Sequence, residues 1–81
     1  DATSKVMEDW MYEKYAEKYV LDPKVQEWMR EVNPWALKRT AEILLEASQR
    51  ELWNAREETL QQLQKLCLDV DGELEEKADE A

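Results

Sequence analysis

Histidine is absent from this 81-residue chain, and cysteine and glycine occur once each. Without histidine, no imidazole can act as a general acid or base or as a metal ligand. The single cysteine, Cys67, can form neither an internal disulfide nor a thiolate metal cluster, which favours a reducing, cytoplasmic setting. One glycine, Gly72, is too few for the loops that hold nucleotide phosphates. The familiar catalytic and cofactor motifs are therefore excluded from this segment.

Turn-forming residues are scarce as well, because only two prolines accompany the single glycine. An all-β domain needs many turns built from Gly, Pro, Asn and Asp, so that fold class is excluded. Glu, Lys, Leu, Ala and Gln dominate instead, and these residues favour helices. We expect one domain with an all-α fold, a small four-helix bundle-like domain in which one helix is short.

Basic residues are outnumbered, with 11 Lys and Arg against 20 Asp and Glu, which gives a formal net charge of −9. Nucleic-acid binding needs a positive footprint, and anionic membrane surfaces attract positive charge, so neither partner is expected. We expect no transmembrane helix, because no apolar run approaches ~20 residues, and no signal peptide.

Capping signals predict where the first three helices begin. The first helix runs from about Ser4 to Val20, with Thr3 or Ser4 as its N-cap. Asp22 and Asn33 each precede a proline, and proline suits the first helical position. They are therefore predicted to cap a short second helix and a longer third helix.

The last helix is expected to follow Asn54, with Glu57 three residues later completing a capping box. Gly72 is interpreted as the C-cap of this helix. We therefore divide the chain into a helical module of residues 1–72 and an acidic tail of residues 73–81. The tail is expected to fray.

Apolar residues recur at three- and four-residue spacing on each expected helix, which predicts one buried face per helix. The four tryptophans and three tyrosines carry the largest side-chain areas and are expected to be the main anchors of the core. The predicted inward residues are Val6, Met7, Trp10, Met11, Tyr15 and Tyr19 on the first helix, Val25, Trp28, Met29 and Val32 on the second, Trp35, Leu37, Ala41, Leu44, Leu45 and Ser48 on the third, and Leu60, Leu63, Cys67, Val70 and Leu74 on the fourth.

Trp53 stands directly before the expected cap, Asn54. A residue in this place can fold back onto the first turn as a hydrophobic staple, but its partner position holds the charged Glu58. We therefore expect Trp53 to plug the corner between the third and fourth helices and to fix their angle.

Carboxylates are the one reactive group present in number. Glu13 and Glu17 stand one helical turn apart, as do Glu42 and Glu46, but neither pair falls on an apolar stripe. We interpret both pairs as solvent-facing. The run at residues 69–73, DVDGE, places its glycine fourth rather than sixth, so it does not match a calcium loop.

The remaining candidates are also interpreted as structural. Cys67 lies on the apolar seam of the fourth helix and is expected to be a buried thiol. Ser48 has no histidine to activate it. An aromatic stacking platform is conceivable, but aromatic residues at helical spacing are interpreted as core; the residues concerned are Tyr12, Tyr15, Tyr19, Trp10 and Trp28. No catalytic, cofactor-binding or metal-binding residue is predicted.

Four short stretches, WMYEKYAEKYVLDP, NPWAL, ILLEA and LW before an acidic helix start, occur in this order. Their order and spacing over residues 6–75 resemble the C-terminal segment of the large subunit of class I metal chelatases. These are the CobN type of cobaltochelatase and the H type of magnesium chelatase. The VNPWAL form is more similar to the cobaltochelatase branch. None of the four stretches is a catalytic motif.

The resemblance implies a parent subunit that binds a tetrapyrrole and takes part in inserting a divalent metal, cobalt or magnesium. It also implies that separate AAA+ partner subunits hydrolyse ATP with Mg. It transfers no site residue to this chain, so no cofactor of the segment itself is expected. The expected partners are the rest of the parent subunit and the AAA+ subunits. Asp rather than Met at position 1 fits a domain cut from a longer chain.

One position departs from the family pattern. The family usually has glycine before the apolar-Trp pair, whereas this chain has Glu51. If that position adopts a left-handed backbone, Glu51 is strained by about 1 kcal/mol.

The segment is expected to have a structural or docking role and, having been cut from a larger surface, at least one exposed apolar patch. The alternative is a free-standing helical adaptor for protein–protein interaction, which would hold a partner helix in an apolar groove. A third interpretation is that the segment lines the tetrapyrrole cleft.

Overall fold

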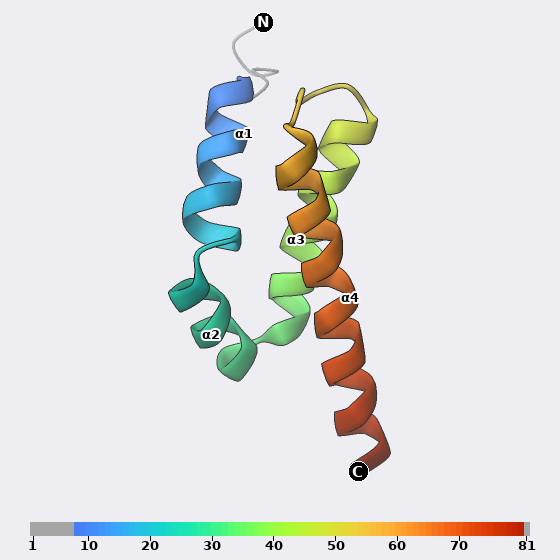
Figure 1. The fold of residues 1–81 in the computed structure, drawn as a ribbon. Coiled ribbons are helices and arrows are strands. Elements are labelled where there is room, and N and C mark those ends of the chain that lie inside the picture. The colour runs from blue at the N-terminus through green and yellow to red at the C-terminus, as the bar shows by residue number, and fades with distance from the viewer. Residues whose placement is uncertain (1–7, 81) are drawn as a thin grey trace, which may run out of the picture.

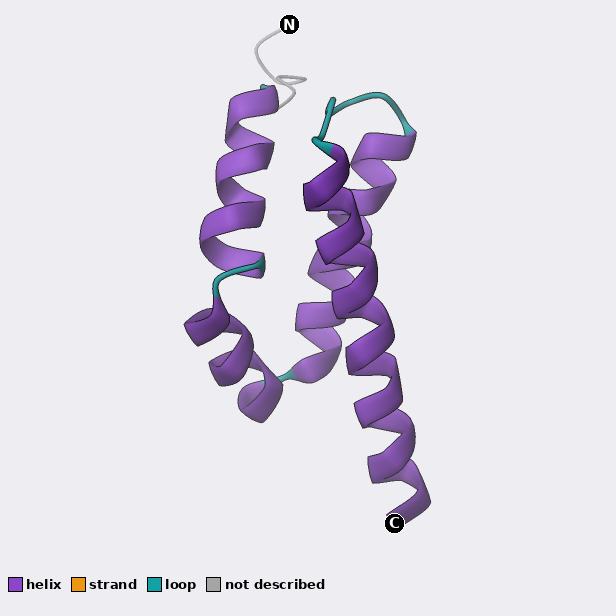
Figure 2. Cartoon of the chain, viewed as in Figure 1, coloured by secondary structure: helices purple, strands orange, loops and turns teal. Residues whose placement is uncertain are grey.

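The computed structural model describes residues 8–80, which are almost entirely helical and include no strand (Figures 1 and 2). The elements in chain order are α1 (Asp9–Tyr15), the π-helix η2 (Ala16–Val20), α2 (Pro23–Val32), α3 (Pro34–Gln49) and α4 (Glu57–Glu80). The all-α expectation is confirmed, with α2 as the short helix. The expected cap of the first helix at Thr3 or Ser4 lies outside the described residues.

The molecule is elongated, with extents of 49 × 27 × 23 Å. Helices α3 and α4 lie antiparallel and form the most extensive contact between elements. The first helical segment stands beside this pair, and its η2 part packs on α3. Helix α2 crosses obliquely below it and packs on both α3 and η2.

Two of the predicted caps are present. The Asp22 carboxylate accepts a hydrogen bond from the Lys24 backbone N–H at 2.8 Å, and the Asn33 side chain accepts one from the Ala36 N–H at 3.1 Å. Each satisfies an amide that the first helical turn leaves unpaired, and a proline follows each cap. These local signals define the starts of α2 and α3.

The first helix widens before it ends. The Leu21 N–H donates to the Ala16 carbonyl at 2.7 Å, which is the i→i+5 bond of a π-helix rather than the i→i+4 bond of an α-helix. The sequence pattern did not predict this change. Ala16 and Val20, at the two ends of η2, are both buried.

Helix α3 ends in a Schellman motif. The Leu52 N–H donates to the Ala47 carbonyl at 2.9 Å and the Glu51 N–H donates to the Ser48 carbonyl at 3.1 Å. Glu51 has φ 62°, so the left-handed backbone expected from the resemblance is confirmed. The chain needs this reversal to bring Trp53 back over the end of α3.

The predicted start of the last helix is wrong. Helix α4 begins at Glu57, and its first bond runs from the Leu60 N–H to the Arg56 carbonyl at 3.0 Å. The residue before this helix is Arg56, so Asn54 is two residues too early to be its cap, and Asn54 and Glu57 do not form a capping box. Residues 53–56 are irregular because Trp53 must enter the core before the helix can begin.

The predicted end of the last helix is also wrong. Helix α4 continues through Gly72 to Glu80, so Gly72 is an interior position and not a C-cap. An interior glycine costs about 1 kcal/mol relative to alanine, and the good helix formers around it offset that cost. The division at residue 72 therefore does not coincide with a helix end. Fraying of residues 73–81 stays a prediction.

The core combines small and large side chains. It follows the predicted seams of the last two helices and adds residues that the pattern missed. Its buried members are Ala16, Val20, Leu37, Ala41, Leu44, Ala47, Trp53, Leu63, Leu66 and Val70.

The aromatic anchors were largely predicted wrongly. Six residues expected to face inward are exposed: Trp10, Tyr15, Tyr19, Trp28, Val32 and Trp35. On the first helix the buried stripe lies one residue away, at half-buried Tyr12 and buried Ala16 and Val20. The small Ala16 side chain lets η2 approach α3 closely, a place where the larger neighbouring tyrosines do not fit.

Candidate functional site

Trp53 joins three parts of the molecule at the corner between α3 and α4. Its side chain is only 1% exposed, and its ring stacks on Tyr12 of α1 with centroids 5.8 Å apart and planes inclined by 18°. The prediction of a corner plug is confirmed. The contact with Tyr12 was not predicted, and it extends the role of Trp53 to holding α1 against the α3–α4 corner.

A polar cluster lies close to this stack, between α1 and the start of α4. The Glu13 carboxylate accepts a hydrogen bond from Arg56 Nε at 2.8 Å and another from Thr59 Oγ1 at 2.9 Å. Arg56 also pairs with Glu17. Thr59 is only 2% exposed, so its hydroxyl needs a partner within the protein.

Glu13 is therefore not the solvent-facing residue expected from its spacing. Its side chain is half-buried, and its carboxylate accepts hydrogen bonds from two residues that lie 43 and 46 positions later in the chain. The spacing of Glu13 and Glu17 placed them on one face, but nothing local identified Arg56 and Thr59 as their partners. The cluster links α1 to the start of α4.

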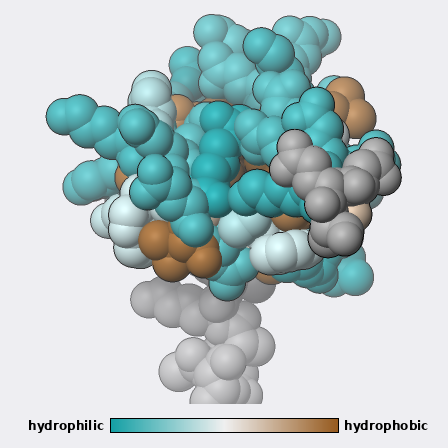
Figure 3. Space-filling model, turned by 90° about the horizontal axis from the view of Figure 1, so that it is seen from below, coloured by the Kyte–Doolittle hydropathy of each residue, from teal (hydrophilic) through white to brown (hydrophobic). Residues whose placement is uncertain are grey.

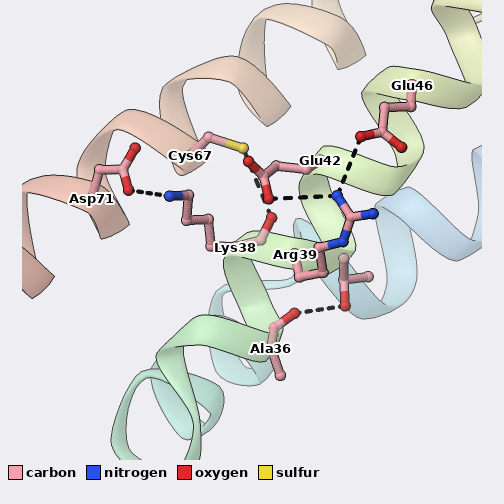
Figure 4. Close-up of polar contacts among 8 residues, drawn as sticks. Ala36, Lys38, Arg39, Glu42, Glu46, Cys67 and Asp71 are labelled. Carbon is pink, nitrogen blue, oxygen red and sulfur yellow. Dashed lines mark hydrogen bonds and ion pairs between the residues drawn. The ribbon is translucent and has the colours of Figure 1, made fainter.

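The second carboxylate pair, Glu42 and Glu46, lies on α3 on either side of Arg39 (Figure 4). Arg39 contacts both carboxylates, with its Nη1 atom 3.8 Å from Glu42 and 3.2 Å from Glu46. These are surface ion pairs along one helix, which contribute well below 1 kcal/mol each. Glu46 is exposed as expected, whereas Glu42 is half-buried.

Cys67 faces α3 from α4 (Figure 4). It is half-buried, and its Sγ lies 4.0 Å from the Lys38 carbonyl oxygen. Burial raises the pKa of the Cys67 thiol, and the carboxylates of Glu42 and Asp71 raise that pKa further. The neutral thiol is therefore favoured at pH 7, and it is a poor nucleophile and metal ligand.

Lys38 and Asp71 form an ion pair between α3 and α4 (Figure 4). The hydrogen bond from Lys38 to Asp71 raises the pKa of the lysine, which keeps the amine protonated. Lys38 is thus held as a cation and cannot serve as a general base near neutral pH.

The described residues gather no set of metal ligands. Across residues 8–80, no three side chains of His, Cys, Asp or Glu converge. The stretch that was compared with a calcium loop, residues 69–73, is part of α4. No helix within the described part has the length and apolar character needed to cross a bilayer.

The surface does carry exposed apolar side chains, as expected. Three of the four tryptophans are exposed, together with two tyrosines and four aliphatic residues. Trp28 and Val32 on α2 and Trp35 on α3 stand on either side of the bend between these helices. Several exposed tryptophans on one small domain are more typical of a surface that contacts a partner than of a surface that stays in solvent.

Comparison with known proteins decides the family. A family model described as CobN/magnesium chelatase matches residues 1–60. The chain belongs to the CobN/magnesium chelatase family. Its expected resemblance to the large-subunit type of these proteins is confirmed by relatives of both metal branches.

Three curated relatives illustrate the range of similarity. An uncharacterised protein of Methanocaldococcus jannaschii is 51% identical over 77 residues, which cover 95% of this chain and 6% of that protein. The H-type magnesium-chelatase subunit of Chlorobaculum parvum is 39% identical, covering 99% of this chain and 6% of that protein. The CobN-type subunit of the aerobic cobaltochelatase of Pseudomonas aeruginosa is 41% identical, and the match covers 90% of this chain and 6% of that subunit.

A solved structure extends the similarity to three dimensions. The catalytic subunit of cobaltochelatase from Mycobacterium tuberculosis superimposes with a TM-score of 0.82 at 49% identity. The match covers 89% of this chain and 6% of that subunit. The chain thus spans about 6% of the length of the relatives that it matches.

Proposed function

We propose that this chain is a structural or docking module of a CobN-type large subunit, and that the parent takes part in ATP-dependent insertion of a divalent metal into a tetrapyrrole. Cobalt is favoured and magnesium is the second candidate. The pathway class would be cobalamin or chlorophyll-type biosynthesis. The observation that carries the proposal is the match of nearly the whole chain to 6% of a cobaltochelatase catalytic subunit, at 49% identity.

The proposal assigns no contact with metal or ring to the described residues. The candidate polar groups on α1, α3 and α4 are engaged with one another, as in the Glu13–Arg56 and Lys38–Asp71 pairs. Scattered surface carboxylates attract divalent ions only weakly and in a salt-screened way. The metal, the ATP and the tetrapyrrole would then be handled by the rest of the subunit and by AAA+ partner subunits, in a cytoplasmic setting.

A segment exchange tests this proposal. The matched segment of the Mycobacterium tuberculosis subunit would be replaced by this chain, and cobalt and magnesium insertion would be assayed after the other subunits are added. We expect the chimera to assemble and to insert cobalt, whereas deletion of the segment should lower the yield of assembled subunit. A chimera that neither folds nor assembles would contradict the proposal.

The structural role has a separate test in the same chimera. Trp53→Ala should reduce the amount of assembled enzyme while leaving turnover per assembled complex close to that of the unchanged chimera. Loss of normalised turnover with intact assembly would mean that the segment lines the tetrapyrrole cleft. Isothermal titration of the chain alone should show no saturable binding of cobalt or magnesium at micromolar concentrations.

A further inference from the structure

Three large apolar side chains stand in solvent at the bend between α2 and α3. Trp28 is 60% exposed, Val32 61% and Trp35 66%. Trp28 and Val32 are one helical turn apart and share a side of α2. Trp35 follows Val32 by three residues, which span at most about 11 Å. We call these three residues the elbow face.

The exposure of the elbow face is built into the fold. The side chain of Asn33 caps α3, and Pro34 begins it in a buried position. This arrangement directs Leu37, Ala41 and Leu44 of α3 toward the core. Trp35 then lies on the opposite side of α3, because the buried residues occupy the other face at helical spacing. The elbow face cannot turn inward without undoing this cap and core.

The bend between α2 and α3 also lines a hollow near the end of α4, on other sides of the two helices than the elbow face. The hollow, of about 380 Å³, is lined by Arg30, Pro34, Glu73, Leu74, Glu76 and Lys77. Figure 1 places the α2–α3 bend and the C-terminal half of α4 at the same end of the molecule. Figure 3 looks onto this end, where apolar side chains lie among polar ones. The surface thus combines exposed apolar groups with the carboxylates of α4.

We propose that the elbow face docks onto the remainder of a CobN-type large subunit, on an apolar patch that also carries basic side chains. The inference rests on the proposed function. Relatives of this family match the chain over only 6% of their length, so the other 94% adjoins the corresponding module in each of them. Tryptophan is the residue most enriched at the energetic centre of interfaces.

The net charge of the chain distinguishes between the partners that could cover the elbow face. The chain has a net charge of −9, so two copies joined through their acidic ends would carry −18. The like charges of the two copies would repel each other and oppose self-association. The same charge disfavours nucleic acid and anionic membranes. A protein surface with basic residues next to apolar ones complements both the exposed tryptophans and the net negative charge of the chain.

Hydrogen exchange in the segment-exchange chimera tests the docking surface directly. We expect the amides around Trp28 to Ala36 to exchange at least tenfold more slowly in the chimera than in the isolated chain. The double variant Trp28→Gln, Trp35→Gln should lose that protection. A second variant, Glu76→Lys, should reduce it because the carboxylate would no longer meet a basic group.

Leu68→Gln is the matched control, because Leu68 is 72% exposed on α4 and lies outside the elbow face. It should keep the protection, and circular dichroism of each isolated variant should show unchanged helix content. Equal protection in the elbow variants and the control would overturn the docking surface alone. Sedimentation showing a dimer of the isolated chain that the elbow variants abolish would assign the face to a second copy and overturn the inference. Failure of the unchanged chimera to assemble would instead overturn the proposed function and this inference with it.

Discussion

Individual residues show that size alone did not select the core. Trp53 is buried and stacked on Tyr12, whereas Trp10, Trp28 and Trp35 are exposed. Trp53 differs because the left-handed Glu51 and the irregular residues 53–56 carry it back over the corner between two helices. A tryptophan on a straight helix face has no comparable pocket unless another element covers it.

Trp53→Ala should lower the free energy of unfolding by about 3–5 kcal/mol, because the change removes a fully buried large side chain and leaves a cavity. Trp35→Ala is the control, since this tryptophan is exposed, and it should change the free energy by no more than about 0.5 kcal/mol. Urea titration followed by circular dichroism measures both values. Similar losses in the two variants would contradict the role of Trp53 as a corner plug.

Glu51→Gly should raise the free energy of unfolding by roughly 0.5–1 kcal/mol. Residue 51 has φ 62°, and glycine adopts this backbone without the clash that a Cβ atom brings. The gain is partly offset because glycine makes the unfolded chain more flexible. Gln49→Gly, in the last turn of α3, should lower the melting temperature instead, because its backbone is helical. A lower melting temperature for Glu51→Gly would refute the strain argument.

At the scale of elements, α1 is attached to the molecule through few groups. Its described side chains reach the rest of the fold through the Tyr12–Trp53 stack and the Glu13 hydrogen bonds. Its extension η2 packs on α3 through Ala16 and Val20. Helices α3 and α4, by contrast, share a long apolar seam. We infer that α1 opens more readily than the α3–α4 pair.

Glu13→Ala should therefore act mainly on α1. It leaves the buried Thr59 hydroxyl without its partner, at a cost of about 1–3 kcal/mol. Glu17→Ala removes only an exposed ion pair with Arg56 and should cost less than about 0.5 kcal/mol. Native-state hydrogen exchange should show faster exchange in residues 9–20 for Glu13→Ala than for Glu17→Ala. Indistinguishable exchange in the two variants would mean that the Glu13 contacts do not hold α1.

At the scale of the whole molecule, the buried apolar residues between residues 8 and 80 form one core shared by η2, α3, α4 and the loop that carries Trp53. Side-chain caps on α2 and α3 and the Schellman motif after α3 satisfy helix ends locally. All of these contacts lie between described residues, whereas Trp10, Trp28 and Trp35 are exposed.

The isolated chain should accordingly fold as a helical monomer or a weakly associating one. Its far-ultraviolet circular dichroism at neutral pH should be helical, and it should melt cooperatively. The physical reason is that the α3–α4 seam and the Trp53 corner lie wholly within the 81 residues. A random-coil spectrum or a melt without a transition would show that the body of a larger subunit is needed for folding.

The sequence by itself determined the features that depend on near neighbours. The scarcity of glycine and proline excluded a β fold, Asp22 and Asn33 marked two helix starts, and the 3.6-residue period identified Leu37, Leu44, Leu63 and Val70 as core. Family resemblance, rather than local pattern, singled out the left-handed Glu51. The caps and the helical period each act within about one or two helical turns.

The tertiary structure decided what depends on distant partners. Which side of the first helix is buried followed from how closely Ala16 lets η2 approach α3, and the role of Glu13 followed from Arg56 and Thr59, more than 40 residues away. The start of α4 was set by the insertion of Trp53. Gly72 stayed helical, and beyond it Leu74 packs against the core and Glu73 pairs with Arg30 of α2. The exposure of the elbow face likewise depends on how two capped helices meet. A one-dimensional period records that a residue is apolar, but only packing between elements determines which apolar residues are covered.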